Sequence, residues 1–403
     1  MSFCRNLKTS LKLIGIFTVT SCAQDQNIGD SSLLQGWNAI NDPAHFAEWS
    51  KTMPNPTSYE RVFMALPLSG ELSKKPWAGD YWPTHRGGIS FRWLSQDDIQ
   101  NSINYHLKPF EELRQEDITM MSPAEKYDLF RGDPAYTTTN FERDRTEVLA
   151  TIPGHESFRQ GFDIPTWDGL CHAWAPATLL YDSPRPVTLI GRSGHSIPFG
   201  ASDIQALLSL FLDQALLEEN GDFIGERCET EFAKIDERYA RGEINRHERQ
   251  RLKNTDHCND TNAGSFHLAL ANDIGRLDQG FIMDLVRDNE VWNHPIFAYE
   301  SQVLRHIPRA SRGAAIGTES EVELETRVYY VGSGDYAFEL EDPASYTKTV
   351  DYRYKLELDK NGLIIGGSWV SDNQPDFIWK AKRPEFGGFF QELQTIYQAS
   401  TSS

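Results

Sequence analysis

Alternating apolar and polar positions mark the last third of the chain. Val322, Leu324 and Thr326 fall on one side of a strand pattern, and residues 351–358 alternate charged with apolar side chains. Asn361-Gly362 then supplies the turn that is typical of a two-residue hairpin. This period of two predicts that residues 315–385 are mainly antiparallel sheet, either as a C-terminal subdomain or as an extension of the core sheet.

Two earlier segments carry the spacing and the end signals of helices. Ser122 can cap a helix that starts at Pro123, Glu125 can complete the capping box, and Gly132 can end the helix. From residue 202 onward apolar side chains recur at helical spacing until a stop signal at 220–221. The highly charged residues 226–256 predict further helices, with a break at Gly242. We therefore expect an α+β fold.

The first 21 residues have the pattern of a secretory signal. Arg5, Lys8 and Lys12 precede a short apolar stretch that ends just before Cys22. This end resembles a bacterial lipoprotein processing box, so we expect lipid on Cys22 and a polar tether over residues 22–59. No other segment has the length of a membrane span, which predicts an exported, lipid-anchored protein at the outer membrane of a Gram-negative bacterium, or a secreted one.

The net charge of the chain argues against one class of binding partner, nucleic acid. The 403-residue chain carries a net charge of −19 at pH 7. A protein this acidic is repelled by phosphate backbones, so nucleic acid is not expected as a partner.

The five cysteines divide into different roles. Cys4 leaves with the signal and Cys22 is assigned to lipid, which leaves three thiols in an oxidising compartment. Cys228 and Cys258 bracket a charged stretch with little apolar surface, where a disulfide would contribute about 3–4 kcal/mol. Cys171 is then the free thiol.

Cys171 follows a glycine and is expected to begin a helix. The positive end of a helix favours the thiolate, which is the reactive form of the side chain. A thiol nucleophile also needs a histidine base. His172 is adjacent, but neighbours on a helix rarely face each other, so His267 is the preferred candidate.

His267 lies in an apolar run that predicts a strand, and Asp284 lies in the next such run. If these two strands pair, the carboxylate of Asp284 can orient the imidazole of His267. Asp288 and Asn293 are rival third members of the site.

Three tryptophans, Trp82, Trp167 and Trp174, are candidates to line a substrate groove near the cysteine. No metal or organic cofactor is expected. Arg251 stands where a zinc-binding helix that begins with His247 needs its second histidine, and the chain has no phosphate-binding glycine motif.

Several blocks together resemble the transglutaminase elicitor family of oomycete plant pathogens and marine bacteria. They are residues 77–83, 169–176, 225–228 with 258–267, 291–295 with 299–300, and 364–369 with 375–379. Residues 291–295 resemble the surface peptide that plants recognise, and the sequence departs from that peptide after Pro295.

The resemblance implies a papain-like cysteine acyltransferase core that performs protein-glutamine γ-glutamyl transfer. Cys171 is then the nucleophile, His267 the base and Asp284 the orienting residue, and protein substrates supply the glutamine and the lysine or other amine. We expect a catalytic core over residues 60–314, the β-rich region over 315–385 and a C-terminal tail over 386–403.

Two other functions stay open on the sequence. A cysteine protease or amidase uses the same nucleophile and base, and differs only in letting water reach the thioester. A surface binding lipoprotein with an inactive site would differ in having an unreactive Cys171.

Overall fold

The computed structural model describes residues 36–51, 58–95, 98–216, 221–253, 255, 258 and 261–402. The predicted signal over 1–21, the predicted lipidation site Cys22 and the first part of the predicted tether lie outside these residues. None of the helices in the described ranges combines the length and the apolar composition that crossing a bilayer requires.

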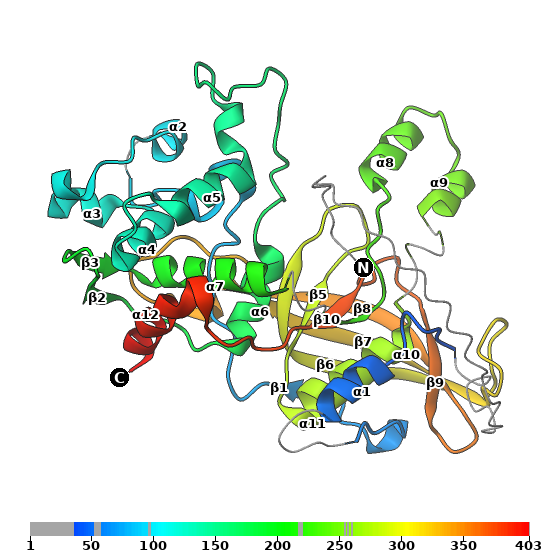
Figure 1. Ribbon diagram of the computed structural model, residues 1–403. Coiled ribbons are helices and arrows are strands. Elements are labelled where there is room, and N and C mark those ends of the chain that lie inside the picture. The colour runs from blue at the N-terminus through cyan, green and yellow to red at the C-terminus, as the bar shows by residue number, and fades with distance from the viewer. Residues whose placement is uncertain are drawn as a thin grey trace, which may run out of the picture.

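An eight-stranded antiparallel sheet lies at the centre of the fold (Figure 1). Its order is β4-β10-β5-β6-β7-β8-β9, and β1 pairs with β6. The strands are β1 (Ser69–Glu71), β4 (Asp222–Ile224), β5 (Phe281–Asp284), β6 (Asn293–Ile307), β7 (Ser320–Val331), β8 (Thr347–Leu358), β9 (Ile364–Trp369) and β10 (Ile378–Lys380). The strands of the predicted β-rich region thus extend the sheet that β4, β5 and β6 belong to.

The helices flank this sheet, and a small hairpin of β2 (Val187–Ile190) and β3 (Ser196–Phe199) stands apart from it. The helices are α1 (Ala44–Lys51), α2 (Ile99–Ile103), α3 (Gln115–Met120), α4 (Pro123–Arg131), α5 (Thr137–Thr146), α6 (Cys171–Leu180), α7 (Ala201–Leu216), α8 (Phe232–Ala240), α9 (Arg246–Lys253), α10 (Ala263–Ala269), α11 (Gly275–Leu277) and α12 (Gln391–Thr401). In Figure 1, α2 to α5, α7 and α12 gather beside the sheet, whereas α8 and α9 project away from it.

The predicted helix signals are confirmed at α4. The Ser122 Oγ accepts a hydrogen bond from the Glu125 N–H, and the Glu125 carboxylate accepts one from the Ser122 N–H. Gly132 ends the helix with a φ of 71°. Between α8 and α9, Gly242 has a φ of 72°, where the sequence suggests a break.

The sheet separates two apolar cores. On one side, which we call the α6 face, Ile282 and Trp379 pack with residues of α4, α6, α7 and α12. On the other side, the α10 face, Phe281 and Met283 pack with residues of α1 and α10. Because successive strand residues point to opposite sides, each site residue on β5 or β10 belongs to one of these faces.

Three segments differ from the sequence predictions. Residues 36–51, assigned to the tether, include α1, whose Phe46 is fully buried. Residues 265–270, predicted as a strand, lie in helix α10 and at the start of the π-helical segment Leu270–Ile274 that continues it, and Asn262 caps α10. A short apolar run carries too little periodicity to separate a helix from a strand. Residues 386–403, assigned to a tail, include α12, whose Leu393 and Ile396 are buried.

Candidate functional site

Cys171 is the first residue of α6, and the turn before it packs against a second segment. The Leu170 N–H donates a hydrogen bond to the Tyr81 carbonyl at 2.7 Å. A Cβ on Gly169 would lie 2.7 Å from the Tyr81 ring, so this crossing requires glycine. The thiol is therefore fixed at a helix start, where N–H groups without helical partners can stabilise an anion.

His172 is linked to a carboxylate on the next helix. Its Nε2 lies 2.7 Å from Oδ1 of Asp213 on α7. Burial lowers the pKa of His172, but hydrogen bonds to Asp213 and to the Cys171 thiol outweigh this and raise it to about 10. The His172 side chain is 44% exposed, so water screens part of this effect. The arrangement favours an imidazolium held between a carboxylate and the thiol.

Asn293, the first residue of β6, lies on the other side of the thiol. Its Nδ2 is 3.8 Å from the Cys171 Sγ, and its Oδ1 accepts a hydrogen bond from the Trp379 Nε1 at 2.8 Å. Trp379 stacks on Phe223 with ring centroids 5.4 Å apart. Because Trp379 occupies the oxygen of the amide, the Asn293 NH₂ group is directed to the sulfur.

The segment that joins β5 to β6 covers the thiol. The Cys171 Sγ donates to the Val291 carbonyl at 3.4 Å, and Cys171 is only 5% exposed. Beside this contact, the rings of Tyr81 and Trp292 meet edge to face at 5.3 Å. Both aromatic residues are partly exposed. They form the rim of the site.

Asp284, the last residue of β5, is a buried acid near the site. It is 0% exposed, and neither carboxylate oxygen has a hydrogen-bond partner among the described residues. Burial first, then the charges of Asp376 and Cys171, raise its pKa well above the ordinary value, while the nearby Trp292 N–H lowers it. Asp288, the rival candidate, is half-buried on the covering segment and accepts a hydrogen bond from the Glu290 N–H at 2.8 Å.

His267 lies on the α10 face, away from these contacts. Its Nδ1 is 2.8 Å from the Tyr354 hydroxyl, and its ring packs near Phe63. Burial lowers its pKa to about 4. The predicted pairing of a His267 strand with the Asp284 strand is wrong, because His267 is on helix α10 and β5 pairs with β6 and β10. Among the described residues, no contact joins His267 to Cys171 or to Asp284.

The three candidate groove tryptophans differ in exposure. Trp82 and Trp174 are 1% and 0% exposed and belong to the core of the α6 face. Trp167 is partly exposed, and the Arg227 guanidinium lies 5.8 Å from its ring centroid. Trp82 and Trp174 are therefore core residues, and of the three only Trp167 can reach a substrate in this state.

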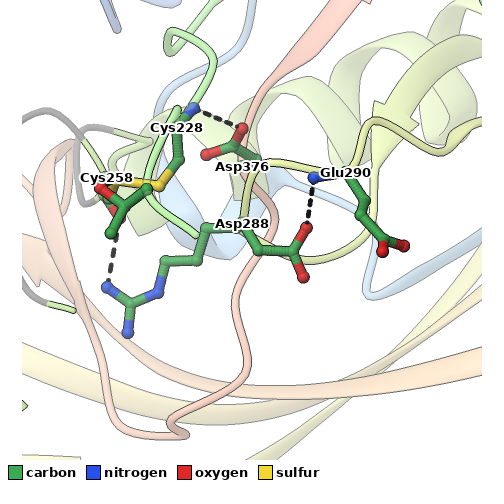
Figure 2. The surroundings of a disulfide bond; sticks show 7 residues. Cys228, Cys258, Asp288, Glu290 and Asp376 are labelled. Carbon is green, nitrogen blue, oxygen red and sulfur yellow. Dashed lines mark hydrogen bonds between the residues drawn. A yellow bond between two sulfur atoms is a disulfide. The ribbon is translucent and has the colours of Figure 1, made fainter. Parts of the chain in front are cut away.

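Cys228 and Cys258 form a disulfide, as the cysteine count predicts (Figure 2). Asp376 accepts a hydrogen bond from the Cys228 N–H at 2.8 Å, and the Arg287 guanidinium donates to the Cys258 carbonyl at 3.2 Å. Asp376 in turn donates its backbone N–H to the Asp284 carbonyl at 3.1 Å. The disulfide is thereby connected both to β5 and to the segment that covers Cys171.

Sequence reasoning missed Asp213 and Trp379. Asp213 has a signal in the sequence, because it follows a long apolar run on a helix, and a buried acid requires a partner. Nothing local identifies that partner as His172. Trp379 carries no comparable signal, since its indole is one of many in the chain.

The sheet, its two faces and the thiol between His172 and Asn293 define an α+β protein with a cysteine-centred site. A family model described as Transglutaminase elicitor matches residues 56–315 and 326–391. The chain belongs to the transglutaminase elicitor family.

Among solved structures, the GP42 transglutaminase from Phytophthora sojae has a similar fold. The TM-score is 0.61 at 22% sequence identity, and the match covers 90% of this chain and 98% of that one. No curated protein sequence matches the chain. The mixed helix and antiparallel-sheet fold is thus supported, whereas the papain-like character of the core stays a prediction.

Proposed function

We propose that the protein is a protein-glutamine γ-glutamyltransferase that acts through Cys171. The observation that carries this proposal is the arrangement around the thiol. Cys171 lies at a helix start beside His172, which Asp213 binds at 2.7 Å. Cysteine acyl transfer needs a nucleophile, a base and a group that orients the base. Membership of the family supports an amine as the acceptor.

In this proposal His172 takes the role that the sequence assigned to His267. Asp213 supplies the orienting carboxylate in place of Asp284. The reason is position, because His172 follows Cys171 at the start of α6 and is paired with Asp213, whereas His267 lies on α10 and has no contact with Cys171 among the described residues.

The reaction then has two halves. The Cys171 thiolate attacks the carboxamide carbon of a glutamine, and the imidazolium of His172 protonates the nitrogen that leaves as ammonia. Backbone N–H groups at the start of α6 and the Asn293 amide are placed to stabilise the oxyanion. A lysine amine next attacks the thioester, His172 takes a proton from it, and the thiolate leaves as the isopeptide forms.

Substrate entry requires the covering segment to move. Val291 occupies the hydrogen-bonding position of the thiol, and Cys171 is 5% exposed. The described state therefore corresponds to a closed site, with Tyr81 and Trp292 at the rim. Movement of 285–292 would expose the sulfur and leave an apolar rim that slows the entry of water.

We also propose export of the protein. A disulfide persists in oxidising compartments and is rare in the cytosol, so the Cys228–Cys258 bond fits an exported protein. Lipid attachment at Cys22 and an outer-membrane location stay predictions from the sequence.

The test is incorporation of a fluorescent primary amine into casein by the full-length protein and by its Cys171→Ala variant. Incorporation that disappears in the variant supports the proposal. Release of casein fragments without incorporation would instead favour the cysteine protease. An unreactive Cys171, with neither outcome, would favour the binding lipoprotein.

A further inference from the structure

Asp284 is a buried acid that the mechanism above does not use. It is 0% exposed, and neither of its carboxylate oxygens makes a well-formed hydrogen bond among the described residues, although the Trp292 N–H of the covering segment is close enough to lower its pKa. Burying a carboxyl without partners is unfavourable by several kcal/mol, so proteins rarely keep one without a ligand or a chemical role. The carboxyl is therefore a candidate contact for a substrate group.

Strand pairing places this carboxyl beside the nucleophile. Asp284 lies directly opposite Asn293 in the antiparallel pair of β5 and β6. Residues opposite each other point to the same face, with their Cβ atoms about 5 Å apart. Asn293 reaches the Cys171 Sγ at 3.8 Å, so Asp284 is one side chain away from the sulfur on the α6 face.

Backbone hydrogen bonds hold Asp284 at this position. Its N–H donates to the Phe377 carbonyl at 3.0 Å, and its carbonyl accepts from the Asp376 N–H at 3.1 Å. The charged groups that act on it most strongly are Asp376 and Cys171, followed by Asp288 at a weaker level. All three charges raise the free energy of ionising the Asp284 carboxyl. A cation that enters beside the carboxyl lowers this free energy.

We propose that Asp284 is the binding residue for the acceptor amine and receives the ammonium group of a lysine side chain. This inference rests on the transferase function proposed above, and it deepens that function by assigning the amine subsite. It also replaces the orienting role that the sequence suggested for Asp284. The buried Asp284 carboxyl is neutral before a cation enters. A cationic acceptor is selected over water because only the cation stabilises its carboxylate form.

The proton balance of the second half-reaction is then complete. As the ammonium binds, the Asp284 carboxyl releases its proton to water. The ammonium then gives one proton to the Asp284 carboxylate and becomes a free amine. The amine attacks the thioester carbon, and its nitrogen gives a second proton to His172. The bond between the carbon and the Cys171 sulfur breaks, and the thiolate and imidazolium are restored. Asp284 is then the neutral acid again.

The experiment compares Asp284→Asn with the wild type, using two acceptors and one glutamine peptide. A lysine peptide is an ammonium at neutral pH, whereas hydroxylamine is uncharged. We expect kcat/KM for the lysine peptide to fall about 100-fold or more, as for loss of a general base. We expect the hydroxylamine rate to stay within about threefold, since its attack needs no charge partner.

Asp288→Asn is the matched control, because it removes the neighbouring carboxylate of the covering segment. It should change neither acceptor by more than about threefold. Equal losses with both acceptors in Asp284→Asn, or no loss with either, would overturn the inference. Ammonia release in the first turnover reports acylation of Cys171 separately. Its absence in the wild type would reject the transferase function itself rather than the amine subsite.

A second measurement uses only the wild type and stays informative if Asp284→Asn does not fold. Pentylammonium and pentanol have the same chain and differ in charge. The ammonium should inhibit lysine transfer competitively and at least about tenfold more strongly, as expected for one charged hydrogen bond. Equal inhibition by the two compounds would contradict an acidic amine subsite.

Discussion

The two faces of the central sheet each carry a histidine, and the two side chains differ in exposure, hydrogen-bond partner and pKa. His172 on the α6 face pairs with Asp213 at 2.7 Å, and its pKa rises to about 10. His267 on the α10 face has its Nδ1 2.8 Å from the Tyr354 hydroxyl and packs near aromatic rings, and its pKa falls to about 4. The first is held as a cation beside a thiol, and the second is held neutral.

Residue type alone therefore does not identify a catalytic base. An apolar environment keeps a histidine neutral and inert, whereas a carboxylate partner and a nearby thiol keep it charged and exchangeable. Each of the following substitutions removes one contact of the site or of the α10 face.

The largest expected effect is on activity, from Asp213→Asn. Without the carboxylate, His172 loses its orientation and its charge partner, so amine incorporation should fall about 100-fold or more. His267→Gln is the matched variant on the α10 face, and its rate should stay within about threefold of the wild type. A folded His267→Gln protein without activity would reverse the assignment of the base.

Removal of the disulfide should have the next largest effect, on stability. Cys258→Ser opens a loop of 30 residues, which should lower the free energy of unfolding by about 3–4 kcal/mol, as measured by urea denaturation. Because Arg287 and Asp376 tie the disulfide to the site, iodoacetamide should also modify Cys171 faster in this variant. An unchanged rate of modification would show that the covering segment is held by other contacts.

Acid should destabilise the α10 face through His267. Its folded pKa of about 4 lies below the ordinary value of 6.5, so the unfolded chain binds the proton more tightly. Stability from this group is complete above pH 6.5 and is lost as pH falls toward 4, by about 3 kcal/mol at most. Urea denaturation at neutral and acidic pH should show a smaller loss in His267→Gln. An identical loss in both proteins would contradict burial as the cause.

The smallest expected effect comes from removing a single hydrogen bond on each face of the sheet. Trp379→Phe removes the donor to Asn293 on the α6 face, and Trp369→Phe removes the donor to the Thr261 carbonyl at 2.7 Å on the α10 face. Each should lower the free energy of unfolding by about 1 kcal/mol. Only Trp379→Phe should also slow amine incorporation, because it frees the amide that faces Cys171. Equal rates in the two variants would show that the Asn293 amide does not assist the reaction at Cys171.

Local patterns predicted the strands of residues 315–385, the caps of α4 and the break at Gly242, because each depends on neighbouring residues. The same logic failed at His267, where a short apolar run fits a helix and a strand equally well. The disulfide followed from counting thiols. The site did not follow in the same way, since the pairing of His172 with Asp213 depends on how α6 packs against α7, and the position of Asp284 depends on strand register.

In the proposed mechanism, a glutamine acylates Cys171 with help from His172 and Asp213. The most direct measurement is mass spectrometry of the full-length protein after brief incubation with a glutamine peptide and an acid quench, without an amine. We expect an acyl group on Cys171, formed at the same rate in His267→Gln as in the wild type and much more slowly in Asp213→Asn. An acyl group on another residue, or an unmodified Cys171 in protein that incorporates amines, would contradict it.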